Sequence, residues 1–217
     1  MKKGQQVEGV VTRVDFPNKG IVQTDDGDLI TVKNVLEGQR ILCVIKKTRK
    51  GKAEGRLLEV VKKSPLEMDV PACKHFDQCG GCSYQTLPYE EQVALKGRQI
   101  KRLLEPVLPE NSFDDLFEGV IPSPNQFAYR NKMEFSFGDA YFNGPLSLGM
   151  HKRGSFYDIV TVDGCQIIDE DMRCVLMETL AYFQERGANY YHKMRHEGYL
   201  RHLLVRKAAK TGEILVD

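Results

Sequence analysis

The chain of 217 residues is long enough for two compact domains, or for one domain with a small appendage. Hydrophobic residues make up 41% and charged residues 28%, an ordinary balance for a soluble protein, and no apolar run could span a bilayer. The opening MKKGQQVEGV lacks the apolar core of a secretory signal peptide, so we expect a cytoplasmic protein with reduced thiols. Six cysteines in that compartment favour a metal site over disulfides.

The formal net charge of +1 hides an uneven distribution along the chain. Residues 1–63 contain 14 Lys and Arg against 8 Asp and Glu, whereas residues 64–217 contain 17 against 22. This basic N-terminal unit suggests an anionic partner such as nucleic acid, with a lysine-rich solvated surface as an equal alternative on charge alone.

Residues 1–62 predict five short strands and no helix. Alternating apolar residues mark the first strand, and the Asp-Gly of TDDGD signals a hairpin between the second and third. Apolar residues at 41–45 and 55–61 supply the fourth and fifth strands, with Cys43 as a small core residue. Because closure removes exposed strand edges, we expect a small OB-like β-barrel of the kind that often binds oligonucleotides.

The stretch KKTRKGK, residues 46–52, is predicted to be a basic turn between the last two strands. Such a density of cations could neutralise several phosphates, so we favour a contact with RNA or DNA over a solvated hairpin tip. The candidate RNA-binding residues here are Lys46, Lys47, Arg49, Lys50 and Lys52. Together with the opening GxVxRVDFxNKGI and the return DGxLIxV, this loop makes the segment resemble a TRAM domain, an RNA-binding barrel appended to RNA-modifying enzymes.

Three cysteines lie within ten residues in CKHFDQCGGCSYQ, residues 73–85. The spacing is Cys73-x5-Cys79-x2-Cys82, and Cys165 in VDGCQI is a fourth candidate far downstream. Four thiolates suit either a tetrahedral zinc ion or a four-iron cluster. We regard four unrelated thiols as an improbable alternative in a reduced chain.

The two glycines between the last close pair of cysteines favour a tightly wrapped metal centre. Gly80 and Gly81 permit unusual backbone angles, and N–H groups there can point at sulfur. Zinc ligands usually come as two close pairs, a pattern that this spacing lacks, and His75 or His151 could in principle replace one ligand. The radical SAM spacing C-x3-C-x2-C is also excluded, because the first gap here is five residues.

The motif C-x5-C-G-G-C-x-x-Q is complete in residues 73–85, and three further stretches accompany it: YRNKMEFSFG (129–138), LGMHKRGSFYDIV (148–160) and LRHLLVRKAAKTGEILV (200–216). On these motifs nearly the whole chain resembles the RNA uracil-5-methyltransferase family, in particular the branch with a TRAM domain that methylates uridine in 23S ribosomal RNA. The resemblance implies a [4Fe–4S] cluster bound by Cys73, Cys79, Cys82 and Cys165. Zinc remains the alternative metal.

A helix is predicted over residues 88–105, because Pro88 and two acids suit its first turn and Pro106 stops it. Its expected apolar stripe consists of Val93, Ile100, Leu103 and Leu104. In the family this helix packs against the catalytic domain. An ordinary helix that covers its own core is the alternative.

The remaining chain alternates strands round glycine-rich turns and contains a second helix in EDMRCVLMETLAYFQERG. Gly187 suits the C-terminal cap of this helix, and Cys174 is expected to be a packing residue rather than a fifth ligand. The residues at helical spacing are Met172, Leu176, Thr179 and Phe183. Residues 200–216 are predicted to be strand, turn and strand, which makes an α+β central domain.

Basic residues in this central domain are candidates for contacts with RNA, since cations set the backbone register and aromatic rings stack on unpaired bases. A mixed β-surface without a ligand is the alternative. The candidates are Arg130 and Lys132 beside Tyr129, then Lys152 and Arg153 beside His151, and Arg201 beside His202.

A methyltransferase of this family needs a Rossmann-like SAM site, a cysteine nucleophile and a general base. In the family these lie downstream, and the sequence up to Asp217 contains no G-x-G-x-x-G and no match to the catalytic motifs. We therefore expect no catalytic or SAM-binding residue here, and a chain that binds RNA but does not catalyse. A stand-alone metal-stabilised RNA-binding module is the competing hypothesis, as is transfer RNA in place of ribosomal RNA.

The predicted organisation is a TRAM-like barrel over 1–62, an iron–sulfur segment over 63–87, a docking helix over 88–110 and an incomplete α+β domain over 111–217. We expect a monomer that packs against a SAM-binding domain of the full-length parent. Because methylation is redox-neutral, the cluster is expected to be structural, tying Cys165 to the 73–82 loop.

Overall fold

The computed structural model describes residues 1–49, 51–109 and 112–217, so the predicted RNA contact Lys50 lies outside the described residues. The chain forms two compact units. Unit 1 comprises Met1–Val70 and Thr86–Pro122, and unit 2 comprises Pro71–Gln85 and Ser123–Asp217. This division differs from the predicted boundaries, because the cysteine-rich segment packs with the C-terminal sheet and the first long helix packs with the barrel.

No helix in the described ranges has both the length and the apolar character needed to cross a membrane.

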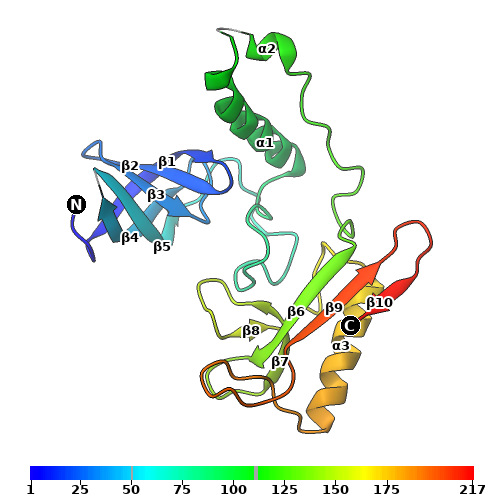
Figure 1. Ribbon diagram of the computed structural model, residues 1–217. Helices are drawn as coiled ribbons and strands as arrows, with labels where there is room; N and C mark the ends of the chain where they lie inside the picture. The colour runs from blue at the N-terminus through cyan, green and yellow to red at the C-terminus, as the bar shows by residue number, and fades with distance from the viewer. Residues whose placement is uncertain (50, 110–111) are drawn as a thin grey trace. The chain divides into compact units, whose positions relative to one another are not determined.

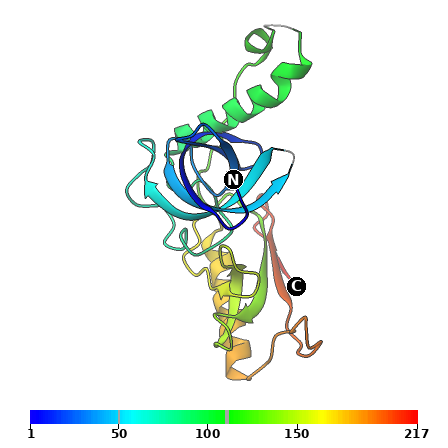
Figure 2. The ribbon, with the colours of Figure 1, turned by 90° about the vertical axis from the view of Figure 1, so that its left-hand side faces the viewer.

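Unit 1 contains a closed barrel of five strands, as the sequence predicts (Figures 1 and 2). The strand order is β1-β2-β3-β5-β4, and the one parallel pair in this barrel, β3 with β5, closes the ring. Its core is formed by alternate residues of the strands, among them Val14, Ile41 and the fully buried Cys43. The strands are β1 (Gln6–Asp15), β2 (Lys19–Thr24), β3 (Leu29–Lys33), β4 (Arg40–Arg49) and β5 (Lys52–Lys62).

The basic stretch 46–52 is largely strand rather than the predicted turn. Strand β4 continues to Arg49, which pairs directly with Lys52 at the start of β5. Within this ladder Lys47 lies opposite Glu54, a cross-strand pair of opposite charge. The described basic side chains of this hairpin are all exposed: Lys46, Lys47, Arg49 and Lys52.

Helix α1 (Tyr89–Leu104) begins after Pro88, as predicted, and carries acids in its first turn. It is followed by the short helices η1 (Glu105–Val107) and α2 (Phe113–Leu116). The predicted apolar stripe is wrong at its C-terminal end, because Leu103 and Leu104 are exposed. The residues that α1 buries are instead Leu95 and Gln99.

Polar contacts explain why a glutamine can be buried on α1. The Nε2 of Gln99 donates to the carbonyl oxygen of Val14 at 3.2 Å, and the guanidinium of Arg102 donates to the same oxygen at 2.8 Å. Arg102 also pairs with Asp15 at 3.1 Å. Helix α1 is therefore attached to strand β1 of its own unit.

Replacing Gln99 by Leu should destabilise unit 1 by about 1–2 kcal/mol, since the Val14 carbonyl oxygen loses the hydrogen bond that the Gln99 amide donates. Urea denaturation followed by circular dichroism measures the change. Glu90→Gln, at an exposed position in the first turn of α1, is the control and should change stability by less than about 0.5 kcal/mol. Equal stabilities of Gln99→Leu and the wild type would contradict the buried contact.

Unit 2 is a five-stranded antiparallel sheet with order β10-β9-β6-β7-β8, and α3 (Glu170–Glu185) lies against one face (Figure 1). The strands are β6 (Lys132–Asp139), β7 (Leu146–His151), β8 (Ile159–Val160), β9 (His202–Lys207) and β10 (Ile214–Val216). This agrees with the predicted α+β arrangement and with the predicted strand, turn and strand at the C-terminal end.

The core of unit 2 lies between the sheet and α3. Phe135, Leu148 and Val205 of the sheet are fully buried, together with Met172 and Leu176 of the helix. Two of the four predicted stripe residues thus lie in the core, whereas Thr179 and Phe183 are half-buried and Leu180 takes the next core position.

Two smaller predictions about α3 have opposite outcomes. Gly187 directly follows the capping residue Arg186 and has φ of 60°, a left-handed conformation that suits glycine. Cys174, predicted to pack, is exposed, because it lies on the face of α3 that does not contact the sheet.

The N-terminus of α3 is held by Asp169. Its carboxylate accepts from the backbone N–H of Met172 at 3.1 Å and pairs with Lys207 at the end of β9, which also pairs with Asp171. Burial alone would raise the pKa of Asp169, but the hydrogen bonds from Lys207 and Met172 outweigh it and lower the pKa below its ordinary value.

The lowered pKa gives a pH-dependent prediction for Asp169→Asn, which keeps a capping oxygen but loses the charge. A carboxyl whose folded pKa is depressed stabilises the fold above its unfolded pKa of about 3.9 and loses that contribution as pH falls through the folded pKa. We expect the variant to be less stable by about 0.5–1 kcal/mol at pH 7, with the difference shrinking below about pH 4. Urea titrations across this range measure it, and a pH-independent difference would contradict the assignment.

Candidate metal centre

The four predicted metal ligands all lie in unit 2. Cys73 and Cys165 are buried, each 8% exposed, and Cys79 and Cys82 are half-buried. Cys165 belongs to the core cluster of this unit, and Cys79 and Cys82 pack against that cluster. All four are free thiols. The fold therefore brings the distant Cys165 into the same unit as the 73–82 loop.

Tight turns, and one bridge to the segment at His151, shape the cysteine loop. The N–H of Cys79 donates to the carbonyl oxygen of His75 at 2.7 Å, and the N–H of Gly80 donates to that of His151 at 3.0 Å. A Cβ at position 80 would lie only 3.0 Å from that same His151 oxygen, and one at Gly81 would lie 3.4 Å from the Cys79 sulfur. Close approach therefore favours glycine at position 80, whereas neither Gly80 nor Gly81 has the positive φ that unusual backbone angles would require.

Asp163 links the cysteine loop to the segment that carries Cys165. One of its oxygens lies 3.0 Å from Lys74 Nζ, and the other lies 2.9 Å from His75 Nε2. The same ring nitrogen lies 3.1 Å from the backbone N–H of Gly164, so it accepts from that N–H when neutral and faces the carboxylate when protonated. The hydrogen bond from Lys74 is the main cause of the lowered pKa of Asp163.

Two arginines hold the carbonyl groups of the two cysteine segments. Arg153 donates to the carbonyl oxygens of Cys82 at 2.8 Å and Phe76 at 3.1 Å, with a longer contact of 3.4 Å to that of Cys79. Its guanidinium also stacks over the Phe76 ring at 5.0 Å. Arg153 was predicted to contact RNA, but its guanidinium is engaged inside unit 2.

The second arginine, Arg173 on α3, performs the same task for the other segment. It donates to the carbonyl oxygens of Cys165 and Ile168, each at 3.0 Å. Sequence reasoning missed both clamps, since nothing in the sequence marks an arginine whose partners are backbone carbonyls far along the chain. Each cysteine segment is thus held by the guanidinium of a half-buried arginine, which donates to its backbone carbonyl oxygens.

Several N–H groups point at the sulfurs themselves. The N–H of Gly81 lies 3.4 Å from the Cys79 sulfur, and Nε2 of Gln85 lies 3.6 Å from that of Cys82. Burial raises the pKa of the Cys165 thiol, and the backbone N–H groups of Ile167 and Ile168 offset part of that rise. Donors of this kind stabilise thiolates and are found round iron–sulfur clusters.

The thiols influence one another electrostatically. Burial is the largest cause that raises the pKa of Cys165, and the neighbouring thiols of Cys73 and Cys82 raise it further. Burial likewise raises the pKa of Cys79, with smaller contributions from Cys82 and Cys73. Thiolates close to one another repel, so a cationic group between them would relieve that repulsion.

In the ranges that the structure describes, no group of three or more His, Cys, Asp or Glu side chains is arranged to hold a metal ion. The four cysteines therefore share one region of unit 2 without forming a ready-made ion site. Their role as ligands stays a prediction.

The other predicted RNA contacts lie in different surroundings. Arg130, Lys132 and Lys152 are exposed, and Arg201 is exposed with its guanidinium 3.5 Å from the centre of the Tyr191 ring. Burial lowers the pKa of His151, as do the charges of Lys193 and His202. The structure thus leaves four of the five central-domain cations at the surface and turns Arg153 inward.

Comparison with known proteins finds relatives that match the whole chain and are named as RNA methyltransferases. Over all 217 residues it is 42% identical to a protein of Caldanaerobacter subterraneus named as an uncharacterized RNA methyltransferase, of which it covers 47%. A Clostridium tetani protein with the same description is also 42% identical, with all of this chain and 46% of the relative covered. The chain is a homologue of RNA methyltransferases. It spans about half the length of these relatives and corresponds to their N-terminal part.

A solved structure shares the fold of this RNA methyltransferase homologue. The tRNA (uracil-54, C5)-methyltransferase of Pyrococcus abyssi, in complex with S-adenosyl-L-homocysteine, matches with a TM-score of 0.66 and 22% identity, covering 97% of this chain and 45% of that one. At this identity the likeness concerns the fold alone. No protein-family model matches the chain.

Proposed function

We propose that this chain is the RNA-recognition part of a SAM-dependent methyltransferase that methylates C5 of a uridine in RNA. The observation that carries the proposal is the 42% identity, over the whole chain, to proteins named RNA methyltransferases. The fold shared with a uracil-C5 methyltransferase supports the uracil specificity. The five-stranded barrel with its exposed cationic hairpin supports RNA binding, because cations that project from a small barrel can track phosphates.

The methyl transfer itself is assigned to the part of the relatives that this chain does not span. SAM, the cysteine nucleophile and the general base would belong there, and the chain would pack against that part through the helix over 88–110 in a monomeric, cytoplasmic protein. The bound S-adenosyl-L-homocysteine in the archaeal structure supports SAM as the methyl donor. The chain alone should bind RNA without methylating it.

The favoured substrate is 23S ribosomal RNA, because the barrel resembles a TRAM domain and the motifs resemble those of the ribosomal branch. Transfer RNA is the alternative, and the name of the archaeal neighbour favours it. Labelled transcripts of both classes, titrated against the chain and against the protein of the full reading frame with radiolabelled SAM, separate the two. We expect 5-methyluridine only with the longer protein and preferentially in the 23S transcript. Failure of both proteins to bind either RNA would refute the proposal.

We further propose that Cys73, Cys79, Cys82 and Cys165 hold one [4Fe–4S] cluster with a structural role. The chemistry of the donor set supports this proposal, because two buried and two half-buried thiols lie in one unit and N–H groups act on three of their sulfurs. A bound cluster would supply the positive iron centre that buried thiolates need, and would cross-link the 73–82 loop to the segment before α3. Zinc is the alternative, but it needs four sulfurs about 2.3 Å from one ion.

A further inference from the structure

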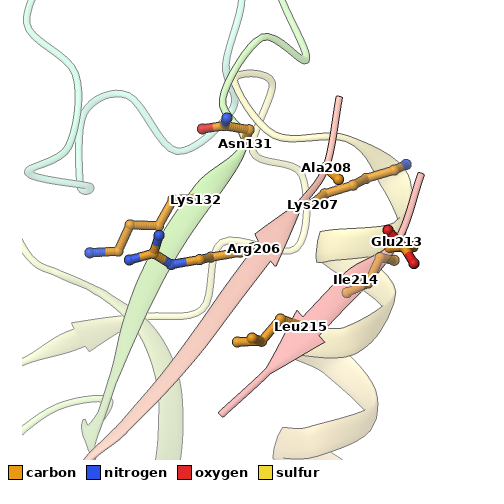
Figure 3. A pocket seen from close by; sticks show the side chains of 8 residues that line it. All are labelled: Asn131, Lys132, Arg206, Lys207, Ala208, Glu213, Ile214 and Leu215. Carbon is orange, nitrogen blue, oxygen red and sulfur yellow. The ribbon is translucent and has the colours of Figure 1, made fainter. Parts of the chain in front are cut away.

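The face of the unit 2 sheet opposite α3 carries a pair of like charges. Strands β6 and β9 are paired so that Lys132 lies directly opposite Arg206. Both side chains are exposed, and Figure 3 shows them extending to the same side of the sheet. Two like charges directly opposite each other on neighbouring strands destabilise a sheet. The pairing therefore carries a cost that nothing in the packing of unit 2 explains.

The charges round this pair leave it cationic. Lys132 has one acidic neighbour on its face, Glu134, whose oxygen lies 3.5 Å from its Nζ. Within the described part of the chain, the Arg206 guanidinium has no hydrogen-bond or ion-pair partner. A third cation lies close by, since Arg130 Nε donates to the backbone oxygen of Lys132 at 3.1 Å. Three cations thus lie near one carboxylate at the pair, and Glu213 brings a second carboxylate to the hollow that contains the pair.

The surface here is also hollowed. A hollow of about 380 Å³ is lined by the ends of β6, β9 and β10 and contains both members of the pair. Leu215 lies beside Arg206 and is 54% exposed, which gives the hollow an apolar wall (Figure 3). Lys207 extends to the opposite side, where two aspartates neutralise it, and Glu213 accepts from the Thr211 hydroxyl at 2.8 Å.

We propose that Lys132 and Arg206, assisted by Arg130, form a binding site for a phosphodiester of single-stranded RNA. A phosphate between the two cations would offset their repulsion and give the guanidinium a bidentate partner. Leu215 offers an apolar surface for the adjoining sugar or base. Sequence analysis marked Lys132 and Arg130 but not Arg206, whose position opposite Lys132 appears only once the strands pair. The inference rests on the proposed function, since it needs the chain to bind RNA.

The test measures the salt dependence of binding to a fluorescein-labelled oligouridylate by anisotropy, with the anaerobically purified chain. Each phosphate contact contributes about 0.7 to the slope of log affinity against log salt for single strands. Because one phosphate is proposed to lie between the two cations, we expect the double variant Lys132→Gln/Arg206→Gln to lower the slope by about 0.7 and Arg206→Gln alone to lower it by a smaller amount. Arg206→Lys keeps the charge and should keep the slope of the wild type.

The matched control is Arg186→Gln, which removes one exposed positive charge at the end of α3 on the other side of the sheet. It should leave the slope unchanged. Melting temperatures confirm folding, and Arg206→Gln should melt no lower than the wild type because it relieves a like-charge contact. A wild-type slope in both glutamine variants overturns the site while leaving the proposed function intact. No binding by the wild type refutes the proposed function itself.

Discussion

Cys165→Ser should abolish the brown colour of the anaerobically purified chain and strongly destabilise unit 2. A cluster held by the four cysteines would close the long loop between the 73–82 segment and residue 165, so its loss would remove a cross-link between distant parts of the chain. Cross-links over loops of this length contribute about 3–5 kcal/mol. Visible absorbance, bleaching by dithionite and thermal unfolding measure the loss, and Cys79→Ser should behave in the same way.

The chain offers a matched control in its exposed cysteine. Cys174→Ser removes one thiol from the outer face of α3 and should leave both the absorbance and the melting temperature unchanged. If Cys165→Ser kept the colour and stability of the wild type, Cys165 could not be a ligand. Equal loss in Cys174→Ser would contradict a specific role for the four proposed ligands, which are buried or half-buried while Cys174 is exposed.

Arg153→Met should be the most disruptive change that leaves every cysteine in place. Methionine has a similar length but no donors, so the carbonyl oxygens of Phe76 and Cys82 lose their partner inside unit 2. An unsatisfied buried acceptor costs about 1–3 kcal/mol, and this substitution leaves more than one carbonyl oxygen without its donor. We expect a fall of about 3 kcal/mol in stability and faster bleaching in air, since the loop that carries three ligands is loosened.

The control for this change is its neighbour in sequence. Lys152→Met removes the same charge from an exposed side chain. Its stability should match that of the wild type within about 0.5 kcal/mol, and its bleaching rate should equal that of the wild type. The two variants are compared by urea denaturation under anaerobic conditions and by the decay of visible absorbance in air. Similar decay in both would contradict the clamp and return Arg153 to the surface role that its sequence context suggested.

Local signals predicted the elements well. The Asp-Gly turn after β2, the prolines on either side of α1 and the acids at the start of α3 each act through neighbouring residues, so the strands and helices lie close to their expected positions. The closed barrel followed from five strands without a helix, since an open sheet of that size would expose its edges.

Tertiary partners decided what the sequence could not. A glutamine is buried at position 99 because the Val14 carbonyl, far along the chain, accepts its hydrogen bond. Arg153 turns inward because its guanidinium donates to backbone carbonyl oxygens of the cysteine loop. Arg206 could not be singled out before the strands paired, since only the pairing places it opposite Lys132. Composition and periodicity carry no information on such pairings. The same limit explains why the exposed face of α3 at Cys174 was predicted as packed.

The sequence marks the proposed ligands of the candidate centre but not the contacts that hold them. The spacing of Cys73, Cys79 and Cys82 marked the loop, and only the family resemblance singled out Cys165. The links through Asp163 and Arg173, which hold that last cysteine in place, have no signature in the sequence.

Native mass spectrometry of the anaerobically purified chain tests the proposed cluster most directly. One inorganic group shared by four sulfurs predicts a single species, heavier than the bare polypeptide by four iron and four sulfide atoms, that disappears in Cys165→Ser. A species carrying one zinc, or the bare polypeptide alone with all four thiols open to alkylation, would contradict it.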